Sequence, residues 1–170
     1  MRRGLRRIGD MTFAEAAERH LDDVHRYLVF LTGDQAVAED LTAETFEQAF
    51  RSWKRFDSTR GSAKTWLCQL ARSNALDWFR SEERRRRREA SVAQAGVVEE
   101  PFSEGFSPAL AEALADATAS EREVVALCVV LELERAAAAR VLGISETACT
   151  TRLSRALKKL EERMTADVRA

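Results

Sequence analysis

Four long cations lie close together near the carboxyl end of the chain, in residues 150–160, with no acidic residue among them. Arg152, Arg155 and Lys159 share one helical stripe, and Lys158 lies beside it. Cations spaced in this way can bind the phosphates of a nucleic-acid backbone. The neighbouring polar face is made of Glu146, Thr147, Thr150, Thr151 and Ser154. Short hydroxyls do not make the bidentate contacts that discriminate strongly between bases, so we expect this helix to position DNA better than it selects a sequence.

The segment that precedes these cations has the spacing of a helix-turn-helix. Ala139 lies four residues before Gly143, and Cys149 lies six residues after it. The alanine lets two helices approach closely, the glycine permits the turn, and the later apolar residue anchors the second helix. Ser145 is placed to cap that second helix. An alanine-rich helical hairpin without DNA contact would show the same pattern, so the motif alone leaves both alternatives open.

A stripe of opposite charge lies on the helix that we expect over residues 35–53. Asp40, Glu44 and Glu47 fall at positions i, i+4 and i+7, which places them on one face. Such a face can dock on a basic partner, and it can also be an ordinary solvated surface.

A third charged group surrounds the loop at 54–61 and follows the next helix. Its cations are Lys54, Arg55, Arg60, Lys64, Arg72 and Arg80. Ser73 and Asn74 add small polar side chains to the same helix. Cations that surround a loop in this way can bind the phosphates of a nucleic-acid backbone. The five arginines at 84–88 either bind phosphate or make the helix end soluble.

The sequence contains no P-loop, paired-carboxylate site or nucleophile–base motif, so we expect no enzyme, cofactor or metal site. His20 and His25 are isolated. Cys68, Cys128 and Cys149 are widely spaced, which is typical of small apolar residues in a reduced protein. No apolar run approaches the roughly 20 residues that cross a bilayer, and the basic amino terminus lacks the apolar stretch of a signal peptide. We therefore expect a cytoplasmic protein without membrane insertion.

The composition favours an all-α fold, since the 170 residues include only 7 Gly and 2 Pro and are 45% hydrophobic. Charge is banded although the net charge is −1: residues 91–134 hold one basic residue against nine acidic ones. We predict two small helical domains joined by a flexible linker. The predicted ranges are a basic extension at 1–11, a first domain at 12–89, a linker at 90–106, a helix-turn-helix domain at 107–165 and a tail at 166–170.

Local signals predict where several helices begin and end. Helices are expected over 12–31, with Gly33 after the end, over 35–53, with Asp34 as its cap, and from residue 62 onward, fraying over 80–89. Ser107-Pro108 should begin the second domain. Ser120 and Glu123 have the spacing of a capping box. On the last helix, we expect a core stripe of Cys149, Leu153, Ala156 or Leu157, Leu160 and Met164.

Two long stretches carry a family resemblance. The sequence "LTGDQAVAEDLTAETFEQAFRSWKRFDSTRGSAKTWLCQLARSNALDWFR" resembles the core domain of bacterial sigma factors of the extracytoplasmic-function (ECF) group. "LADATASEREVVALCVVLEL" and the helix-turn-helix resemble that family's second domain, so the resemblance covers about residues 20–165. It implies a transcription initiation factor that directs RNA polymerase core enzyme to promoter DNA, with the linker threading through the polymerase. An anti-sigma factor is a further candidate partner.

The resemblance also implies roles for the charged groups. Asp40, Glu44, Phe46 and Glu47 match the helix that docks on polymerase. The cation-rimmed loop, with Ser73 and Asn74, matches the part that opens DNA at the minus-ten element. The final helix matches the reader of the minus-thirty-five element. Two departures stand out: Ser73 occupies the position where the family usually has Asn, and "TACTTRLSRALKKL" lacks the Gly and Lys of the usual "GTVKSRLHRARKKL".

Two other functions fit part of the pattern. A self-sufficient helix-turn-helix regulator would need a dimer and a palindromic site. A sigma-like protein-interaction module without promoter activity would bind another protein tightly and fail to support transcription.

Overall fold

The computed structural model describes residues 11–89 and 106–167, and every regular element in these ranges is helical. The expected all-α fold is confirmed. The helices are α1 (Phe13–Thr32), α2 (Gln35–Ser52), α3 (Ala63–Glu89), α4 (Pro108–Ala115), α5 (Ala119–Val125), α6 (Arg135–Leu142) and α7 (Glu146–Asp167). A 3-10 turn, η1 (Trp53–Arg55), follows α2, and a π-helical turn, η2 (Ala126–Val130), continues α5. The linker predicted at 90–106 lies outside the described residues except for Phe106, as do most of the extension and the end of the tail.

Most helix ends follow from the expected capping residues. Gly33 and Gly143 adopt left-handed backbone angles, with φ of 70° and 67°, and end α1 and α6. The Asp34 side chain accepts a hydrogen bond from the Val37 N–H and begins α2. Ser107 caps α4 ahead of Pro108, and Ser145 accepts from the Ala148 N–H at the start of α7. Local sequence therefore sets these boundaries.

The capping box predicted at Ser120 and Glu123 is wrong. Helix α5 is capped by Thr118, whose side chain accepts from the Glu121 N–H at 3.2 Å. The Glu121 carboxylate accepts in return from the Thr118 N–H at 2.8 Å. Thr118 and Glu121 have the same three-residue spacing as the predicted pair, and the earlier pair starts the helix. Glu123 is consequently available for a contact elsewhere.

The fraying predicted over residues 80–89 is also not observed, because α3 continues to Glu89. Ion pairs at helical spacing line this charged end: Arg85 contacts Glu82 at 2.8 Å, and Arg87 contacts Glu83 at 2.8 Å. Each such pair adds only a few tenths of a kcal/mol to a helix, roughly 0.2–0.5. Several together, on strong helix formers, keep the segment helical without an apolar face.

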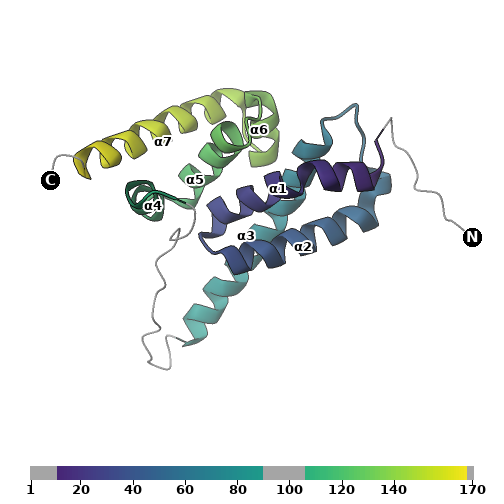
Figure 1. Ribbon diagram of the computed structural model, residues 1–170, viewed down its shortest axis with the longest axis horizontal. Coiled ribbons are helices and arrows are strands. Elements are labelled where there is room, and N and C mark those ends of the chain that lie inside the picture. The colour runs from purple at the N-terminus through teal and green to yellow at the C-terminus, as the bar shows by residue number, and fades with distance from the viewer. Residues whose placement is uncertain (1–10, 90–105, 168–170) are drawn as a thin grey trace, which may run out of the picture.

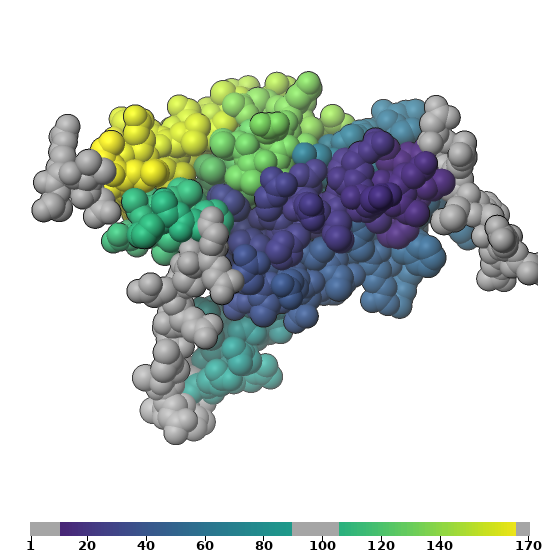
Figure 2. Space-filling view, in the orientation of Figure 1, coloured from purple at the N-terminus to yellow at the C-terminus, as the bar shows by residue number. Residues whose placement is uncertain are grey.

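The helices form two groups, an N-terminal domain of α1–α3 and a C-terminal domain of α4–α7 (Figure 1). Helices α1, α2 and α3 pack against one another, and α7 lies along α4, α5 and α6. The two domains also touch. Helix α1 packs on α5 and η2, and α3 packs on α6. In the space-filling view the green part of the C-terminal domain lies directly against the purple surface of α1 (Figure 2).

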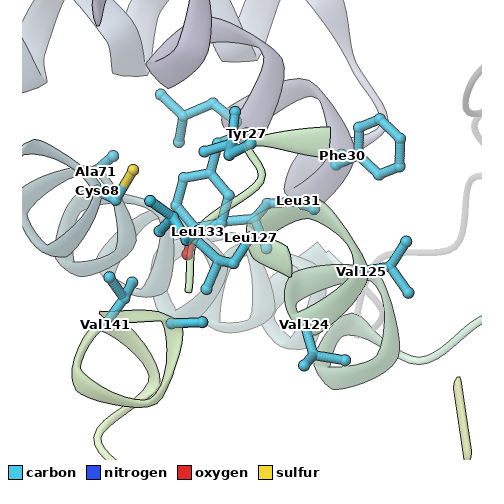
Figure 3. Packing of buried hydrophobic residues seen from close by; sticks show 14 of the residues in the cluster. Tyr27, Phe30, Leu31, Cys68, Ala71, Val124, Val125, Leu127, Leu133 and Val141 are labelled. Carbon is cyan, nitrogen blue, oxygen red and sulfur yellow. The ribbon is translucent and has the colours of Figure 1, made fainter. Parts of the chain in front are cut away.

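One apolar core runs through the contact between the domains. Tyr27 and Leu31 of α1 and Ala71 of α3 meet Leu127 of η2 and Val141 of α6 (Figure 3). All five are buried. The domains therefore share a core rather than a hydrated boundary.

The predicted core stripe of α7 is confirmed at Cys149, Leu153 and Leu160, which are buried, and of the alternatives Ala156 and Leu157 it is Ala156 that is buried, while Leu157 is 41% exposed. The stripe is wrong for Met164, whose side chain is 36% exposed. The reason is that α4, α5 and α6 lie along one side of α7, and a one-sided contact covers a narrow stripe.

Candidate functional site

The predicted acidic stripe lies on the outer face of α2. Asp40, Glu44 and Glu47 are all exposed. The opposite face of the helix is buried against α1 and α3 through Ala38, Leu41, Thr42, Thr45 and Ala49. Since the buried residues fix the rotation of the helix, the three carboxylates must point outward together. The fold thus presents one acidic surface.

Aromatic side chains adjoin this acidic face. Phe46 is half-buried, whereas Phe50 is 61% exposed and makes an edge contact with Phe13 at 5.3 Å between ring centroids. An exposed phenylalanine beside a charged stripe is typical of a protein-binding surface. Phe50 is not among the residues predicted to bind polymerase, because helical spacing does not show which apolar side chains stay exposed.

The loop after α2 is held by a cluster of aromatic rings. Trp53 stacks on Phe56 with centroids 4.9 Å apart, and Trp66 of α3 makes an edge contact with Trp53 at 5.7 Å. Trp53 and Phe56 are buried, while Lys54 and Arg55 between them are exposed. The cluster therefore anchors the loop and leaves its cations at the surface.

The other cations predicted for this region have different surroundings. Arg60 is exposed, and Arg80 is exposed but pairs with Asp77 at 2.9 Å. Lys64 and Arg72 are half-buried, and both bind groups of the C-terminal domain. The structure therefore keeps four of the six predicted cations at the surface and covers two.

Ser73 and Asn74 point in different directions. Ser73 is exposed. The Asn74 amide donates to the hydroxyl of buried Thr45 at 3.2 Å, which links α3 to α2. Ser73 is consequently the member of the pair that faces solvent, and Asn74 contributes to packing.

The helix-turn-helix consists of α6, the turn at Gly143 and α7. Thr147, Thr150, Thr151, Ser154 and Arg155 are exposed along α7, and Arg152 is half-buried. A shallow hollow follows this face; its lining residues are Glu121, Ser145, Thr147, Ala148, Thr151, Arg152 and Arg155. The Thr150 hydroxyl donates to the Glu146 carbonyl at 3.0 Å, so it is engaged by its own helix.

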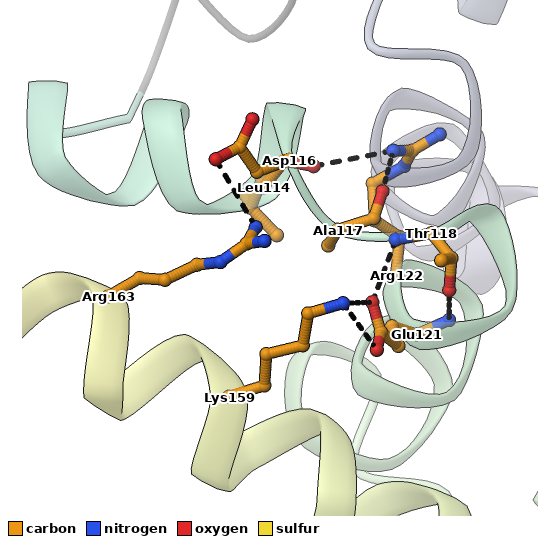
Figure 4. Close-up of polar contacts among 8 residues, drawn as sticks. All are labelled: Leu114, Asp116, Ala117, Thr118, Glu121, Arg122, Lys159 and Arg163. Atoms are coloured by element: carbon orange, nitrogen blue, oxygen red, sulfur yellow. Dashed lines mark hydrogen bonds and ion pairs between the residues drawn. The ribbon is translucent and has the colours of Figure 1, made fainter.

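Two of the predicted phosphate-binding cations have acidic partners. Lys158 lies 3.8 Å from Glu162. Lys159 donates to both carboxylate oxygens of Glu121, at 2.8 and 2.9 Å, across the space between α7 and α5 (Figure 4). Partial burial opposes ionisation of Glu121, but hydrogen bonds from Lys159 and Thr118 hold its pKa below the ordinary value. Sequence reasoning missed Glu121 because it lies 38 residues from its partner.

A buried polar group joins the domains. Glu123 of α5 accepts from Arg72 Nε at 2.6 Å and from the Tyr27 hydroxyl at 3.0 Å. Burial, together with the charge of Glu123, raises the pKa of Tyr27 well above its ordinary value, so the phenol remains a donor. Nearby, Lys64 Nζ donates to the Leu131 carbonyl at 2.7 Å. No local sequence signal identifies these contacts.

Residues 11–89 and 106–167 contain no group of three or more His, Cys, Asp or Glu side chains that could hold a metal ion. Among the helices of these same ranges, none has the length and apolarity to cross a membrane.

Comparisons with known proteins match both halves of the chain. Residues 16–85 match the family model described as Sigma-70 region 2, and residues 109–160 match Sigma-70, region 4. The ECF RNA polymerase sigma factor SigL of Mycobacterium tuberculosis is 34% identical over 165 residues, covering 91% of this chain and 93% of SigL. SigM of Bacillus subtilis, also named an ECF RNA polymerase sigma factor, is 28% identical over 155 residues, covering 89% of this chain and 94% of SigM.

The fold is likewise similar to a solved structure. The sigma factor RpoE from Bartonella quintana, in a co-crystal structure with the anti-sigma factor NepR, matches with a TM-score of 0.77 at 23% identity. The match covers 91% of this chain and 98% of RpoE, so the likeness in fold extends over both domains.

Proposed function

This chain belongs to the ECF group of RNA polymerase sigma factors, and we propose which of its surfaces bind the polymerase, the minus-ten element and the minus-thirty-five element. As a sigma factor, it directs the RNA polymerase core enzyme to promoter DNA for transcription initiation. Its part is binding and positioning, with no catalysis of its own. The assignment of individual residues below is the proposal.

The acidic surface of α2 docks on the polymerase core enzyme. Asp40, Glu44 and Glu47 are fixed on one exposed face, and Phe46 and Phe50 add apolar contact area beside them. Complementary charge steers a partner and sets its orientation, while a buried aromatic side chain supplies much of the affinity. The observation that supports docking most directly is the exposed Phe50 next to three exposed carboxylates.

The loop 54–61 and α3 contact the minus-ten element. Lys54, Arg55 and Arg60 line the exposed loop, which the aromatic cluster holds in place. These cations can bind the backbone of an opened strand, and exposed Ser73 lies on the adjoining helix to contact a base. Arg72 belongs to the same surface once the C-terminal domain leaves it, whereas Lys64 is also paired with Asp23 of α1 at 3.1 Å.

The exposed face of α7 contacts the minus-thirty-five element. Arg152 and Arg155 bind DNA phosphates, and Lys158 and Lys159 bind phosphates further along the helix. Thr147, Thr151 and Ser154 meet base edges or thymine methyl groups, and Thr150 contributes its methyl because its hydroxyl is engaged. Such contacts select weakly. Specificity therefore comes from weak recognition of both promoter elements by one holoenzyme. Once one element is bound, binding of the other is effectively intramolecular.

We propose that an anti-sigma factor is a further partner of this chain. The sigma factor RpoE of Bartonella quintana binds a partner of that class, NepR. The compact two-domain fold, similar to RpoE along nearly the whole chain, supports extending that class of partner to this protein.

Transcription in vitro tests the proposed function. Purified chain and polymerase core enzyme are incubated with a fragmented genomic DNA library, and transcripts are sequenced. We expect discrete start sites that need both components, preceded by two shared elements. Binding to a palindromic site without polymerase would instead support a self-sufficient regulator. Core binding without transcripts would support a sigma-like interaction module.

A further inference from the structure

The carboxyl end of α3, residues 80–89, carries six arginines and three glutamates, and only Arg80 among them belongs to a surface assigned above. We call this segment the α3 arm. The arm is helical to Glu89, although none of its residues is buried. In Figure 1 the teal end of α3 projects past α1 and α2. A helix that adds nothing to the core and concentrates positive charge outside it is suited to binding an anionic partner.

Two arginines of the arm continue the exposed face that contains Ser73. Ser73, Arg80, Arg84 and Arg88 are separated by seven, four and four positions, so their side chains follow one row along the helix. All four are exposed, whereas Ala71, on the opposite side of α3, is completely buried. Because the buried side fixes the rotation of the helix, the row of arginines points outward in the same direction as Ser73.

The acidic residues near this end of α3 are held by other arginines. Ion pairs along the helix join Arg80 with Asp77, Arg85 with Glu82 and Glu89, and Arg87 with Glu83. The glutamates are thereby held beside Arg85 and Arg87, on the flanks of the row. Arg88 Nε donates to the Arg84 carbonyl at 3.3 Å, which keeps the Arg88 side chain over the preceding turn, next to Arg84. Arg84 and Arg88 therefore present their positive charge together.

The length of the row fits a stretch of duplex beside the minus-ten element. Ser73 and Arg88 are 15 positions apart, which is about 22 Å along an α-helix. Duplex DNA rises 3.4 Å per base pair, so this length corresponds to roughly six or seven base pairs. The arm is also the end of the N-terminal domain from which the chain continues to the C-terminal domain, the proposed reader of the upstream element. The duplex on that side of the minus-ten element is the spacer between the two elements.

We propose that Arg84 and Arg88 bind phosphates of the spacer duplex, about five to seven base pairs upstream of the base that Ser73 contacts. The proposal rests on the proposed function, because that function places the minus-ten element at Ser73. The guanidinium group offers a planar fork of donors that matches a phosphate, and both arginines are exposed to receive one. Contacts to phosphate carry no sequence information. The arm consequently adds affinity and fixes the position of the DNA, and it leaves base preference to the two readers.

A matched pair of double variants of the full chain tests this contact. Arg84→Ala with Arg88→Ala removes the row, and Arg85→Ala with Arg87→Ala removes the same number of charges from the same turns of the helix. The control arginines already have carboxylate partners within α3. Alanine is the strongest helix former, so both double variants should keep α3, which circular dichroism checks.

Each protein is assembled with core enzyme and titrated with three labelled promoter duplexes at several salt concentrations. One duplex is unmodified, one has uncharged methylphosphonate linkages in the proposed spacer segment, and one has the same number of these linkages downstream of the minus-ten element. We expect Arg84→Ala with Arg88→Ala to weaken binding of the unmodified duplex at least about tenfold and to reduce the log–log salt slope by roughly two units. Spacer methylphosphonates should weaken the wild type by a similar factor and this variant by less than about twofold, because the phosphates and the arginines form the same contact. The control variant should stay within about threefold of the wild type and remain sensitive to the spacer methylphosphonates.

Several outcomes would overturn the proposal. Wild-type affinity and salt slope in Arg84→Ala with Arg88→Ala would show that the row does not contact DNA, and equal losses in the control variant would assign the effect to net charge. A loss that disappears only on the downstream-modified duplex would place the row on the other side of the minus-ten element. Weaker binding of core enzyme in the absence of DNA would assign the row to the polymerase. In each case the wild-type holoenzyme still binds its promoter, whereas failure of the proposed function would abolish that binding.

Discussion

Lys159 of α7 donates to both carboxylate oxygens of Glu121 at the start of α5, at 2.8 and 2.9 Å. The pair lies at the edge of the proposed minus-thirty-five surface, since Glu121 lines the same hollow as Thr151 and Arg155. A carboxylate at this place has two effects. It neutralises one of the four cations that are proposed to bind phosphates, and it places negative charge where phosphates would approach.

Removing the charge of Glu121 should therefore strengthen DNA binding. In Glu121→Gln, the side chain can still accept from the Thr118 N–H, but Lys159 becomes available to a phosphate. We expect affinity for duplex promoter DNA to rise about two- to fivefold on all sequences, since a partly exposed pair is worth little. The salt dependence should steepen by roughly one unit of log–log slope. Titrations of the holoenzyme at several salt concentrations measure both.

The matched control for this prediction is Lys159→Ala. In the wild-type background it should cost less affinity than Arg155→Ala, and in the Glu121→Gln background it should cancel the gain. An unchanged salt slope in Glu121→Gln would mean that the ion pair only stabilises the packing of α7 on α5.

The acidic surface gives a second prediction. Reversing charge in Asp40→Lys with Glu44→Lys should weaken binding of the core enzyme by at least about tenfold, because two attractive contacts become repulsive. Helicity should stay intact, since both side chains are exposed. Pull-down or biolayer interferometry with core enzyme measures the loss.

A charge-matched control lies on α1. Glu18 and Asp22 are also exposed and have the same four-residue spacing, so Glu18→Lys with Asp22→Lys makes an equal change of net charge elsewhere. Equal losses in the two double variants would assign the effect to net charge and not to a docking surface on α2.

The final helix gives a third prediction. Arg155→Ala should weaken binding by a similar factor on every upstream sequence and reduce the salt slope by roughly one unit, because it removes a phosphate contact. A panel of upstream duplexes at several salt concentrations measures both quantities. If Arg155→Ala instead reordered the sequences and left the slope unchanged, this arginine would read a base.

Asn74 gives a prediction about stability. The Asn74→Ala variant loses the hydrogen bond to buried Thr45 and leaves that hydroxyl with its bond to the Leu41 carbonyl alone. We expect the free energy of unfolding to fall by about 1–2 kcal/mol in urea denaturation. Ser73→Ala, at the exposed neighbouring position, should leave it unchanged within about 0.5 kcal/mol. A larger loss in Ser73→Ala than in Asn74→Ala would reverse the roles given to the two residues.

Local patterns in the sequence were enough to predict much of the fold. Gly33, Asp34, Gly143 and Ser145 mark helix ends because each signal acts over one turn. The acidic face of α2 also follows from spacing alone. The capping box failed because two overlapping pairs satisfy the same pattern, and the sequence does not show which one begins the helix.

Contacts between distant residues could not be predicted in this way. Glu123 and Arg72 are 51 residues apart, and Asn74 and Thr45 are 29 residues apart. Their roles depend on which helices pack together, and periodicity carries no such information. The same limit explains why Lys64 and Arg72 resembled exposed cations in the sequence, although the C-terminal domain covers them.

The central claim is that the two domains read separate promoter elements, and one transcription measurement tests it directly. Holoenzymes with wild-type chain, Ser73→Ala or Thr151→Ala transcribe a promoter library that is randomised in both the minus-ten and minus-thirty-five elements. The account predicts that Ser73→Ala changes the preferred bases of the minus-ten element alone. It predicts that Thr151→Ala changes those of the minus-thirty-five element alone, by at most about 1–3 kcal/mol per base pair. Exchange of these effects between the two variants would contradict the assignment.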